Sequence, residues 1–326
     1  MAAAGAPIGD LSIVDLREMR GEDLGYLLEQ QNLEWRQRLY WDFAPTASII
    51  RRFLDARNLH GYAVLERGRP VGYCYFIYED GKALVGDLYL EKEFREPAWE
   101  RWLLENTVKA AAVYPGVRRV EGQALGLSYE LQDHALYARP VTVIPRLFMM
   151  RVGLDGIEDQ IPGHTPDGLR FGHWDDSDIE PAAQLISGAY ARHIDSLIND
   201  QYRTVAGARR FLVNTTQHTG CGVFLRRASV VARRGIFRSV AGVCLASRVD
   251  DSAGHVTQIC VSPQHRSQGV GREMLRRTLT SLARQGCDVA SLTVTASNKP
   301  AVTLYEKFGF TILRRFSAFI WERDGE

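Results

Sequence analysis

Several features that identify common classes of protein are missing from this chain of 326 residues. Lys and Arg number 40 against 39 Asp and Glu, so the chain lacks the excess positive charge of nucleic-acid or membrane-binding proteins. Uninterrupted apolar runs stay short of the roughly 18 residues that a membrane span needs. Residues 1–10 have neither a basic start nor an apolar centre, so no signal peptide is visible. We therefore expect a cytoplasmic protein with no nucleic-acid and no membrane partner.

Motifs for metal-dependent and hydrolytic chemistry are lacking as well. The five cysteines are scattered and odd in number, which gives no disulfide framework. Neither Cys-x-x-Cys, His-x-x-x-His nor His-Glu-x-x-His occurs, so no metal site is predicted. The absence of Gly-x-Ser-x-Gly argues against an α/β-hydrolase nucleophile.

One turn carries a glycine pattern with a physical meaning. An apolar strand over residues 259–261 runs into Arg266-x-x-Gly269-x-Gly271, and apolar positions at helical spacing follow this turn. Glycine lets the backbone approach a ligand closely, because it has no Cβ. The helix N-terminus beyond it offers unpaired N–H groups and the positive end of a dipole, which together bind anions. We expect a ligand that carries phosphates.

Other phosphate-binding loops do not fit this turn. A Walker loop needs a Lys-Ser/Thr pair, and none follows Gly271. A dinucleotide fingerprint needs a third small residue where Met274 stands. The remaining pattern, Gln/Arg-x-x-Gly-x-Gly/Ala, resembles the coenzyme A pyrophosphate loop of the GNAT superfamily of N-acetyltransferases. An ordinary turn is the alternative for so short a pattern.

A second block downstream resembles the other signature of that family. An alternating strand over residues 291–295 is followed by Asn298-x-x-Ala-x-x-x-Tyr305-x-x-x-Gly309-Phe. Asn298 is a good helix N-cap, Pro300 suits the first helical turn and Gly309 suits the position just past the helix. Two signatures in this order and spacing are more specific than either one alone.

The resemblance implies an acetyl-CoA-dependent N-acetyltransferase that acts on a primary amine of a small molecule or peptide, by direct attack in a ternary complex. Tyr305 matches the family tyrosine that acts as general acid and protonates the departing thiolate. A packing role for Tyr305 and a capping role for Asn298 are the structural alternatives. The residues implied in cofactor binding are Ile259, Cys260, Val261, Arg266, Ser267, Gln268, Gly269, Val270, Gly271, Arg272 and Asn298.

Three further residues near this pattern have two interpretations each. Arg276 and Arg277 are outer candidates for the ribose phosphate, although a solvated helix face explains them better. Cys260 lies beside the expected thioester and invites a nucleophile hypothesis. An apolar strand cysteine is more often a packing residue, and a ternary mechanism needs no covalent step.

No motif identifies the general base. His255 precedes the cofactor strand and has a suitable unperturbed pKa of about 6.5. His193 and Asp195 border the expected acceptor pocket, whereas Asp250 and Asp251 suit a solvated turn. Glutamate is missing at the expected strand position, so a water chain to a remote base is another alternative.

The chain repeats its order of predicted elements, and its length suits two domains. The strand–turn–strand pattern of residues 62–78 returns at 228–249, and Arg95 stands opposite Arg266. We expect an α/β (α+β mixed-sheet) fold of two tandem GNAT-like domains, each a mixed, mostly antiparallel sheet flanked by helices. The expected parts are a flexible N-terminus at 1–10, a degenerate domain at 11–152, a linker at 153–168 and a catalytic domain at 169–326.

The N-terminal copy has lost the glycines of the cofactor turn. Ala98 takes the place of the first glycine and Glu100 that of the second, while Pro97 removes a backbone donor. A carboxylate at this point repels a diphosphate. Tyr137 keeps the place of the family tyrosine.

Several alternatives remain open from the sequence. The protein could be a non-catalytic protein that binds acyl-CoA as a regulatory ligand, or an acyltransferase for a longer acyl chain or a different acceptor. A tandem chain supplies its own pseudo-dimer, so both monomer and homodimer are compatible with it. Four aromatic residues suit a core cluster at a helix end, with a substrate cleft as the alternative: Trp35, Tyr40, Trp41 and Phe43.

Overall fold

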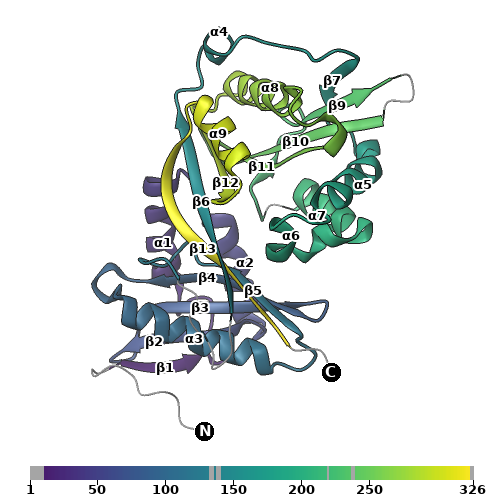
Figure 1. The fold of residues 1–326 in the computed structure, drawn as a ribbon. Helices are drawn as coiled ribbons and strands as arrows, with labels where there is room; N and C mark the ends of the chain where they lie inside the picture. The colour runs from purple at the N-terminus through teal and green to yellow at the C-terminus, as the bar shows by residue number, and fades with distance from the viewer. Residues whose placement is uncertain (1–10, 132–135, 137–140, 219, 236–238, 324–326) are drawn as a thin grey trace. The chain divides into compact units, whose positions relative to one another are not determined.

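The computed structural model describes residues 11–131, 136, 141–218, 220–235 and 239–323 (Figure 1). The expected flexible N-terminus at residues 1–10 lies outside these ranges, as does Tyr137. Contacts divide the chain into two compact units, which we call the N-terminal unit and the C-terminal unit. The first comprises Met1–Leu39, Phe43–Arg146 and Arg315–Glu326, and the second comprises Tyr40–Asp42 and Leu147–Arg314.

The N-terminal unit contains a mixed sheet in the order β1-β2-β3-β4-β5, followed by the end of β13. All neighbours are antiparallel except β4 and β5, which are parallel. The strands are β1 (Leu11–Asp15), β2 (His60–Glu66), β3 (Arg69–Glu79), β4 (Lys82–Leu90), β5 (Arg119–Gln123) and β13 (Thr311–Glu322).

Helices cover both faces of this sheet. They are α1 (Gly25–Leu39), α2 (Ala44–Asp55) and α3 (Pro97–Val113), with the 3-10 turns η1 (Leu16–Glu18) and η2 (Lys92–Phe94). Successive side chains of a strand point to opposite faces. Tyr73 and Tyr75 of β3 accordingly pack in the cluster that contains α1 and α2. Cys74 and Phe76 pack in the cluster that contains α3.

The C-terminal unit contains strands in the order β6-β12-β11-β10-β9-β7, and the short β8 also pairs with β10. The pair β11–β12 is parallel, whereas β10–β11, β9–β10 and β7–β9 are antiparallel. The strands are β6 (Thr142–Val152), β7 (Leu169–His173), β8 (Val223–Phe224), β9 (Val230–Arg234), β10 (Ser239–Asp250), β11 (Ala253–Val261) and β12 (Val289–Thr295).

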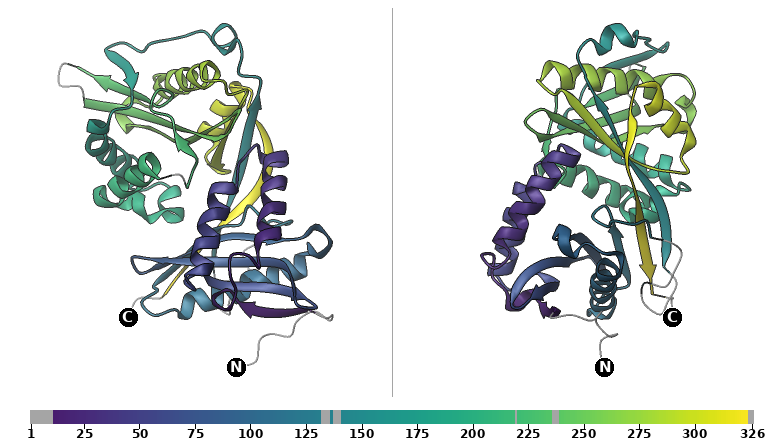
Figure 2. Two further views of the ribbon diagram at one scale, coloured as in Figure 1. Left: turned by 180° about the vertical axis from the view of Figure 1, so that it is seen from behind. Right: turned by 90° about the vertical axis from the view of Figure 1, so that its left-hand side faces the viewer.

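Two groups of helices pack on opposite faces of this sheet (Figure 2). Cys244 and Ala246 of β10 pack in the cluster with α8 and α9, and Val243 and Leu245 pack in the cluster with α5 and α7. The helices are α4 (Ile157–Gln160), α5 (Ile179–Tyr190), α6 (Asp195–Ile198), α7 (Val205–Gln217), α8 (Val270–Arg284) and α9 (Lys299–Lys307). The 3-10 turns are η3 (Asp176–Asp178), η4 (Asp200–Arg203) and η5 (Pro263–His265). The predicted α/β fold of mixed, mostly antiparallel sheets flanked by helices is confirmed.

The two units differ from the linear division expected from the sequence. Residues 318–322 of β13 pair with β5, so the C-terminal end of the chain belongs to the N-terminal unit. Residues 40–42 belong to the C-terminal unit, where Asp42 N–H donates to Val249 O at 2.7 Å. The segment expected as a linker contains the short helix α4. In the described part of the chain, no helix has both the length and the apolarity needed to cross a membrane.

Candidate active site

Strands β11 and β12 separate halfway along their length. Their parallel register ends at the pair Val256↔Leu292, although β11 continues to Val261 and β12 to Thr295. Thr257 is an extra residue against β10, because the β10–β11 register shifts there. Such a bulge bends its strand. The result is a wedge between the two strands, with the last three residues of β11 along one side.

The turn between β11 and α8 has the backbone conformation of an anion-binding nest. Ser267 and Gly269 have φ values of +60° and +82°, so left-handed residues flank Gln268. Conformations that alternate in this way point successive N–H groups into one concavity. Helix α8 begins at Val270, and no side chain of the described residues caps its first turn. The N–H groups of this helix end are therefore directed toward the same concavity.

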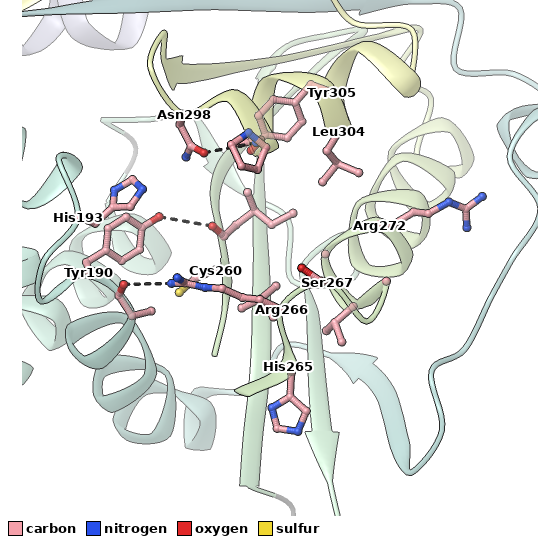
Figure 3. Close-up of a pocket in the computed structure, with 18 of the residues that line it drawn as sticks. Tyr190, His193, Cys260, His265, Arg266, Ser267, Arg272, Asn298, Leu304 and Tyr305 are labelled. Atoms are coloured by element: carbon pink, nitrogen blue, oxygen red, sulfur yellow. Dashed lines mark hydrogen bonds between the residues drawn. The ribbon is translucent and has the colours of Figure 1, made fainter. Parts of the chain in front are cut away.

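A cavity of about 740 Å³ joins the nest to the wedge (Figure 3). Tyr305 and all the predicted cofactor residues line it, except Gln268, whose side-chain Nε2 donates to Gln264 O at 2.8 Å. The cavity also has lining residues that the sequence patterns did not indicate: Ala189, Tyr190, Ile194, His265, Ser297, Pro300, Ala301 and Leu304.

The two predicted cationic ligands are engaged with carbonyl oxygens of the protein. Arg266 extends across the cavity and donates to Ala189 O at 3.2 Å (Figure 3). Arg272 points away from the cavity and donates to Pro162 O at 3.0 Å (Figure 3). Their charge lies beside the nest, while the nest itself consists of backbone groups.

Helix α9 brings its two signature residues to the cavity. Asn298 is the N-cap, and its Oδ1 accepts from Ala301 N–H at 3.4 Å. Tyr305 is 4% exposed and packs in the core cluster of α8 and α9, with the ring of Phe310 centred 6.0 Å away. Asn298 therefore has the capping role and Tyr305 the packing role that the sequence offered as structural alternatives. Both residues also line the cavity.

Tyr190, at the end of α5, is a cavity residue that sequence analysis missed. Its hydroxyl lies 3.5 Å from Ile259 O and accepts from Gln258 Nε2 at 3.1 Å. Tyr202 in turn donates to Gln258 Oε1 at 3.2 Å. Burial raises the pKa of Tyr190 well above its usual value, so its hydroxyl stays protonated. No local motif marks Tyr190, because three elements create its environment.

The base candidates are distributed over different environments. His255 is 7% exposed and does not line the cavity; it shares a hydrogen bond of 2.8 Å with Ser291 Oγ, and Trp41 packs against its ring. Burial lowers the pKa of His255 to about 4. Asp250 and Asp251 lie at the turn between β10 and β11, as the turn interpretation predicts.

His193 and Asp195 form a pair beside the cavity. His193 lines the cavity, and its Nδ1 accepts from Asp195 N–H at 3.2 Å. Thr295 at the end of β12 donates its hydroxyl to Asp195 Oδ1 at 2.5 Å. The segment after α5 is thereby attached to one side of the wedge, while Tyr190 contacts the other.

The structure disfavours Cys260 as a nucleophile and places Arg276 and Arg277 away from the nest. Burial raises the pKa of Cys260 to about 12, so the thiolate that nucleophilic catalysis needs is disfavoured. Arg276 and Arg277 form ion pairs with Glu273 and line a separate cavity. Burial raises the pKa of Glu273, but hydrogen bonds from the two arginines outweigh this effect and lower it to about 2.

The corresponding turn of the N-terminal unit lacks the conformation of the nest. Helix α3 begins at Pro97, and the positive φ values of Ser267 and Gly269 have no counterpart between residues 95 and 100. Glu100 is 1% exposed, and its carboxylate accepts from Ser128 N–H and from the Ser128 hydroxyl at 2.9 and 2.6 Å. Glu100 thus places a carboxylate in the first turn of α3.

The expected aromatic cluster is divided between the units, so that prediction was wrong in part. Trp35 and Phe43 pack in the core of the N-terminal unit, with ring centroids 5.0 Å apart. Trp41 packs on His255 in the C-terminal unit. The chain crosses between units at residues 40–42, which local patterns do not indicate.

Residues 199–310 match the model of the acetyltransferase (GNAT) family. A mycothiol acetyltransferase from Propionibacterium freudenreichii subsp. shermanii is 23% identical over 260 residues, which cover 76% of this chain and 77% of that protein. The ribosomal protein bS18 alanine N-acetyltransferase of Escherichia coli K12 is 39% identical over 61 residues, 18% of this chain and 41% of that enzyme.

Solved structures show the same fold across both units. A tandem GNAT protein from the clavulanic acid biosynthesis pathway superposes with a TM-score of 0.60 at 15% identity, covering 97% of this chain and 99% of that one. A GCN5-related N-acetyltransferase from Sphaerobacter thermophilus gives 0.59 at 18% identity, over 86% and 87% of the two chains. The family match includes the nest and Tyr305, and the tandem fold agrees with the repeat in the sequence. Residues 199–310 therefore form a GNAT acetyltransferase domain in the C-terminal half of the chain, and the similarity to the two acetyltransferases named above supports an N-acetyltransferase.

Proposed function

We propose that the protein transfers an acetyl group from acetyl-CoA to the primary amine of a small molecule, in the cavity of its C-terminal unit. One observation supports this proposal above all others. A single cavity of about 740 Å³ is bordered by three features: the nest at Ser267 and Gly269, the wedge between β11 and β12, and the family tyrosine Tyr305.

The residues at the nest fit a diphosphate. A Cβ on Gly271 would lie 3.5 Å from Val261 Cγ2 and 3.9 Å from Leu304 Cδ2, so its absence leaves space between the helix end and the wedge. The backbone N–H groups of residues 267–272 would hold the diphosphate, with positive charge nearby on Arg266 and Arg272. The wedge would hold the extended arm of the coenzyme through backbone groups of β11.

When bound, acetyl-CoA supplies the acetyl group as a thioester, whose sulfur departs with the electrons of the broken bond. Tyr305 gives this sulfur a proton from its hydroxyl. Asn298 caps α9 and thereby fixes the helix that carries Tyr305. The tyrosine is held in place by packing in a core cluster, which suits a proton donor that must keep its position.

The amine must lose a proton before it attacks, because a lysine-like amine has a pKa of about 10.4. Of the five base candidates, His193 is the one that lines the cavity. Its Nδ1 accepts from Asp195 N–H, so the neutral ring carries its proton on Nε2 and can only donate there. We therefore assign proton removal to water in the cavity, with His193 as a donor that orients the acceptor.

The choice of a small-molecule acceptor rests on the extent of the alignments. The relative aligned over 76% of this chain is by name a mycothiol acetyltransferase. The ribosomal-protein acetyltransferase aligns over 18% of this chain, so it supports the acetyl-CoA end of the site and gives little information about the acceptor.

A screen of acceptors tests the proposal. Thiol release from acetyl-CoA would be followed with small amines, aminoglycosides, free amino acids and peptide N-termini. We expect turnover with at least one small amine and little with peptides. Binding of CoA without thiol release in any mixture would instead support a regulatory acyl-CoA-binding protein. Turnover confined to peptides would overturn the choice of acceptor.

A further inference from the structure

The cavity has two distinct ends. One end is the nest at Ser267 and Gly269, and the other end is closed by the last turn of α5 and the segment after it (Figure 3). Figure 3 shows Tyr190 and His193 across the cavity from Ser267 and Arg272. A ligand that places its diphosphate in the nest and extends through the wedge therefore brings its far end toward Tyr190.

The side chain of Tyr190 is fixed by hydrogen bonds at this end. Its hydroxyl accepts from Gln258 Nε2 at 3.1 Å and lies 3.5 Å from Ile259 O, on the strand that forms the wedge. Gln258 is itself 6% exposed and is held by the Tyr202 hydroxyl at 3.2 Å. A hydrogen bond broken at this buried position would leave polar groups unpaired, which is costly.

The ring of Tyr190 also has little freedom to move aside. The centroid of the Tyr202 ring lies 4.7 Å from it and that of His193 lies 5.2 Å from it. Tyr190 packs against a core cluster that includes Leu185 and Leu212. Cores of this kind are close-packed and accept extra methylene groups only with strain.

We propose that Tyr190 is the residue that limits the length of the acyl group. This inference rests on the proposed function, because it assumes that the acyl end of the coenzyme thioester lies in the wedge. A two-carbon acyl group ends before the ring, whereas a longer chain has to displace Tyr190 from its hydrogen bonds with Gln258. The site therefore selects short acyl chains by a fixed wall.

Binding measurements on a series of acyl-CoA ligands test the proposal without any turnover. Free CoA, acetyl-CoA, butyryl-CoA and hexanoyl-CoA would be titrated calorimetrically into the wild-type protein. We expect affinity to fall by at least about tenfold from acetyl-CoA to hexanoyl-CoA, which corresponds to the cost of overpacking. Equal affinity for the two would overturn the proposal directly.

Two variants locate the selection at the ring of Tyr190. Tyr190→Ala should bind acetyl-CoA and hexanoyl-CoA with affinities within about threefold of each other, because the wall is removed. Tyr202→Phe is the matched control: it removes a hydroxyl from the same network without opening the cavity, and should keep most of the discrimination. A Tyr190→Ala protein that binds free CoA but still rejects hexanoyl-CoA would contradict the assignment.

Titration with free CoA distinguishes a failure of the proposed function from a failure of the role assigned to Tyr190. It carries the diphosphate and the extended arm but no acyl group, so its affinity should be the same in the wild type and in Tyr190→Ala. If the wild type binds neither CoA nor acetyl-CoA, the proposed function fails, and the role of Tyr190 fails with it. If CoA binds and chain length has no effect, only the role of Tyr190 is lost.

Discussion

The carboxylate of Glu100 accepts a hydrogen bond from Ser128 N–H at 2.9 Å, at the point of the N-terminal unit that corresponds to Gly271 in the repeat. In the C-terminal unit the same point borders an open cavity. One copy of the fold thus carries an internal anion where the other leaves space for an external one. This difference agrees with the proposal that the coenzyme binds in the C-terminal unit.

Glu100→Ala should destabilise the N-terminal unit by about 1–3 kcal/mol, because the buried side chain of Glu100 loses its hydrogen bonds from the N–H and hydroxyl of Ser128. The measurement is urea denaturation followed by fluorescence. Glu105→Ala is the control, since Glu105 forms an exposed pair with Arg101 that should contribute only a few tenths of a kcal/mol. Equal effects of the two substitutions would show that the Glu100 contact has no special role.

Gly271→Glu should weaken CoA binding by at least about a hundredfold, because it places a like charge beside the diphosphate. Gly271→Ala should retain measurable binding, since its Cβ would meet Val261 and Leu304 at ordinary contact distances of 3.5 and 3.9 Å. Isothermal titration checks both, with circular dichroism to confirm folding. Normal CoA binding by Gly271→Glu would show that the diphosphate site lies elsewhere.

Tyr305→Phe should bind acetyl-CoA normally and lower kcat by about a hundredfold or more, because the proton donor for the departing sulfur is removed. The ring that packs in the core cluster is kept, so the melting temperature should change little. Steady-state kinetics and calorimetric titration together check this prediction. Loss of binding along with kcat would mean that Tyr305 acts through packing.

The local part of the site could be predicted from the sequence. Gly269 of the nest follows from the glycine pattern at the start of a helical apolar pattern, and the cap of α9 follows from Asn298 and Pro300. These features depend on the backbone preferences of a few neighbouring residues, and the identity of each residue indicates its preference. The left-handed conformation of Ser267, by contrast, has no such signal in the sequence.

The rest of the site depends on contacts between distant segments. Tyr190, Gln258 and Tyr202 come from three elements and have no common motif. The direction of a long side chain cannot be predicted from the sequence either. Arg266, for example, donates to Ala189 O. Sequence periodicity also cannot show that the end of β13 pairs with β5, because register between remote strands is a tertiary property.

Acid should destabilise the C-terminal unit through His255. Burial holds the pKa of folded His255 at about 4, below its unfolded value of about 6.5, so the unfolded state takes up the proton first as the pH falls. Stability should therefore decrease between about pH 6.5 and pH 4, by an amount on the order of 3 kcal/mol, and this contribution should be constant above pH 6.5.

Replacement of His255 by Gln checks the origin of this pH dependence. The variant keeps a polar group that can bond with Ser291, but it has no proton to gain in this range. Its free energy of unfolding, measured by urea titration at several pH values, should vary less between pH 6.5 and 4 than that of the wild type. Parallel pH profiles for the two proteins would assign the effect to other groups.

His193→Gln should preserve the pH dependence of acetylation, because the ring of His193 acts as a donor. Its Nδ1 is occupied by Asp195 N–H, so the proton of the neutral ring lies on Nε2. The variant's kcat/KM should fall by less than about tenfold and should still rise with pH toward the pKa of the amine. An acidic limb near the ordinary imidazole value of about 6.5 that is present in the wild type and absent in His193→Gln would instead identify His193 as the base.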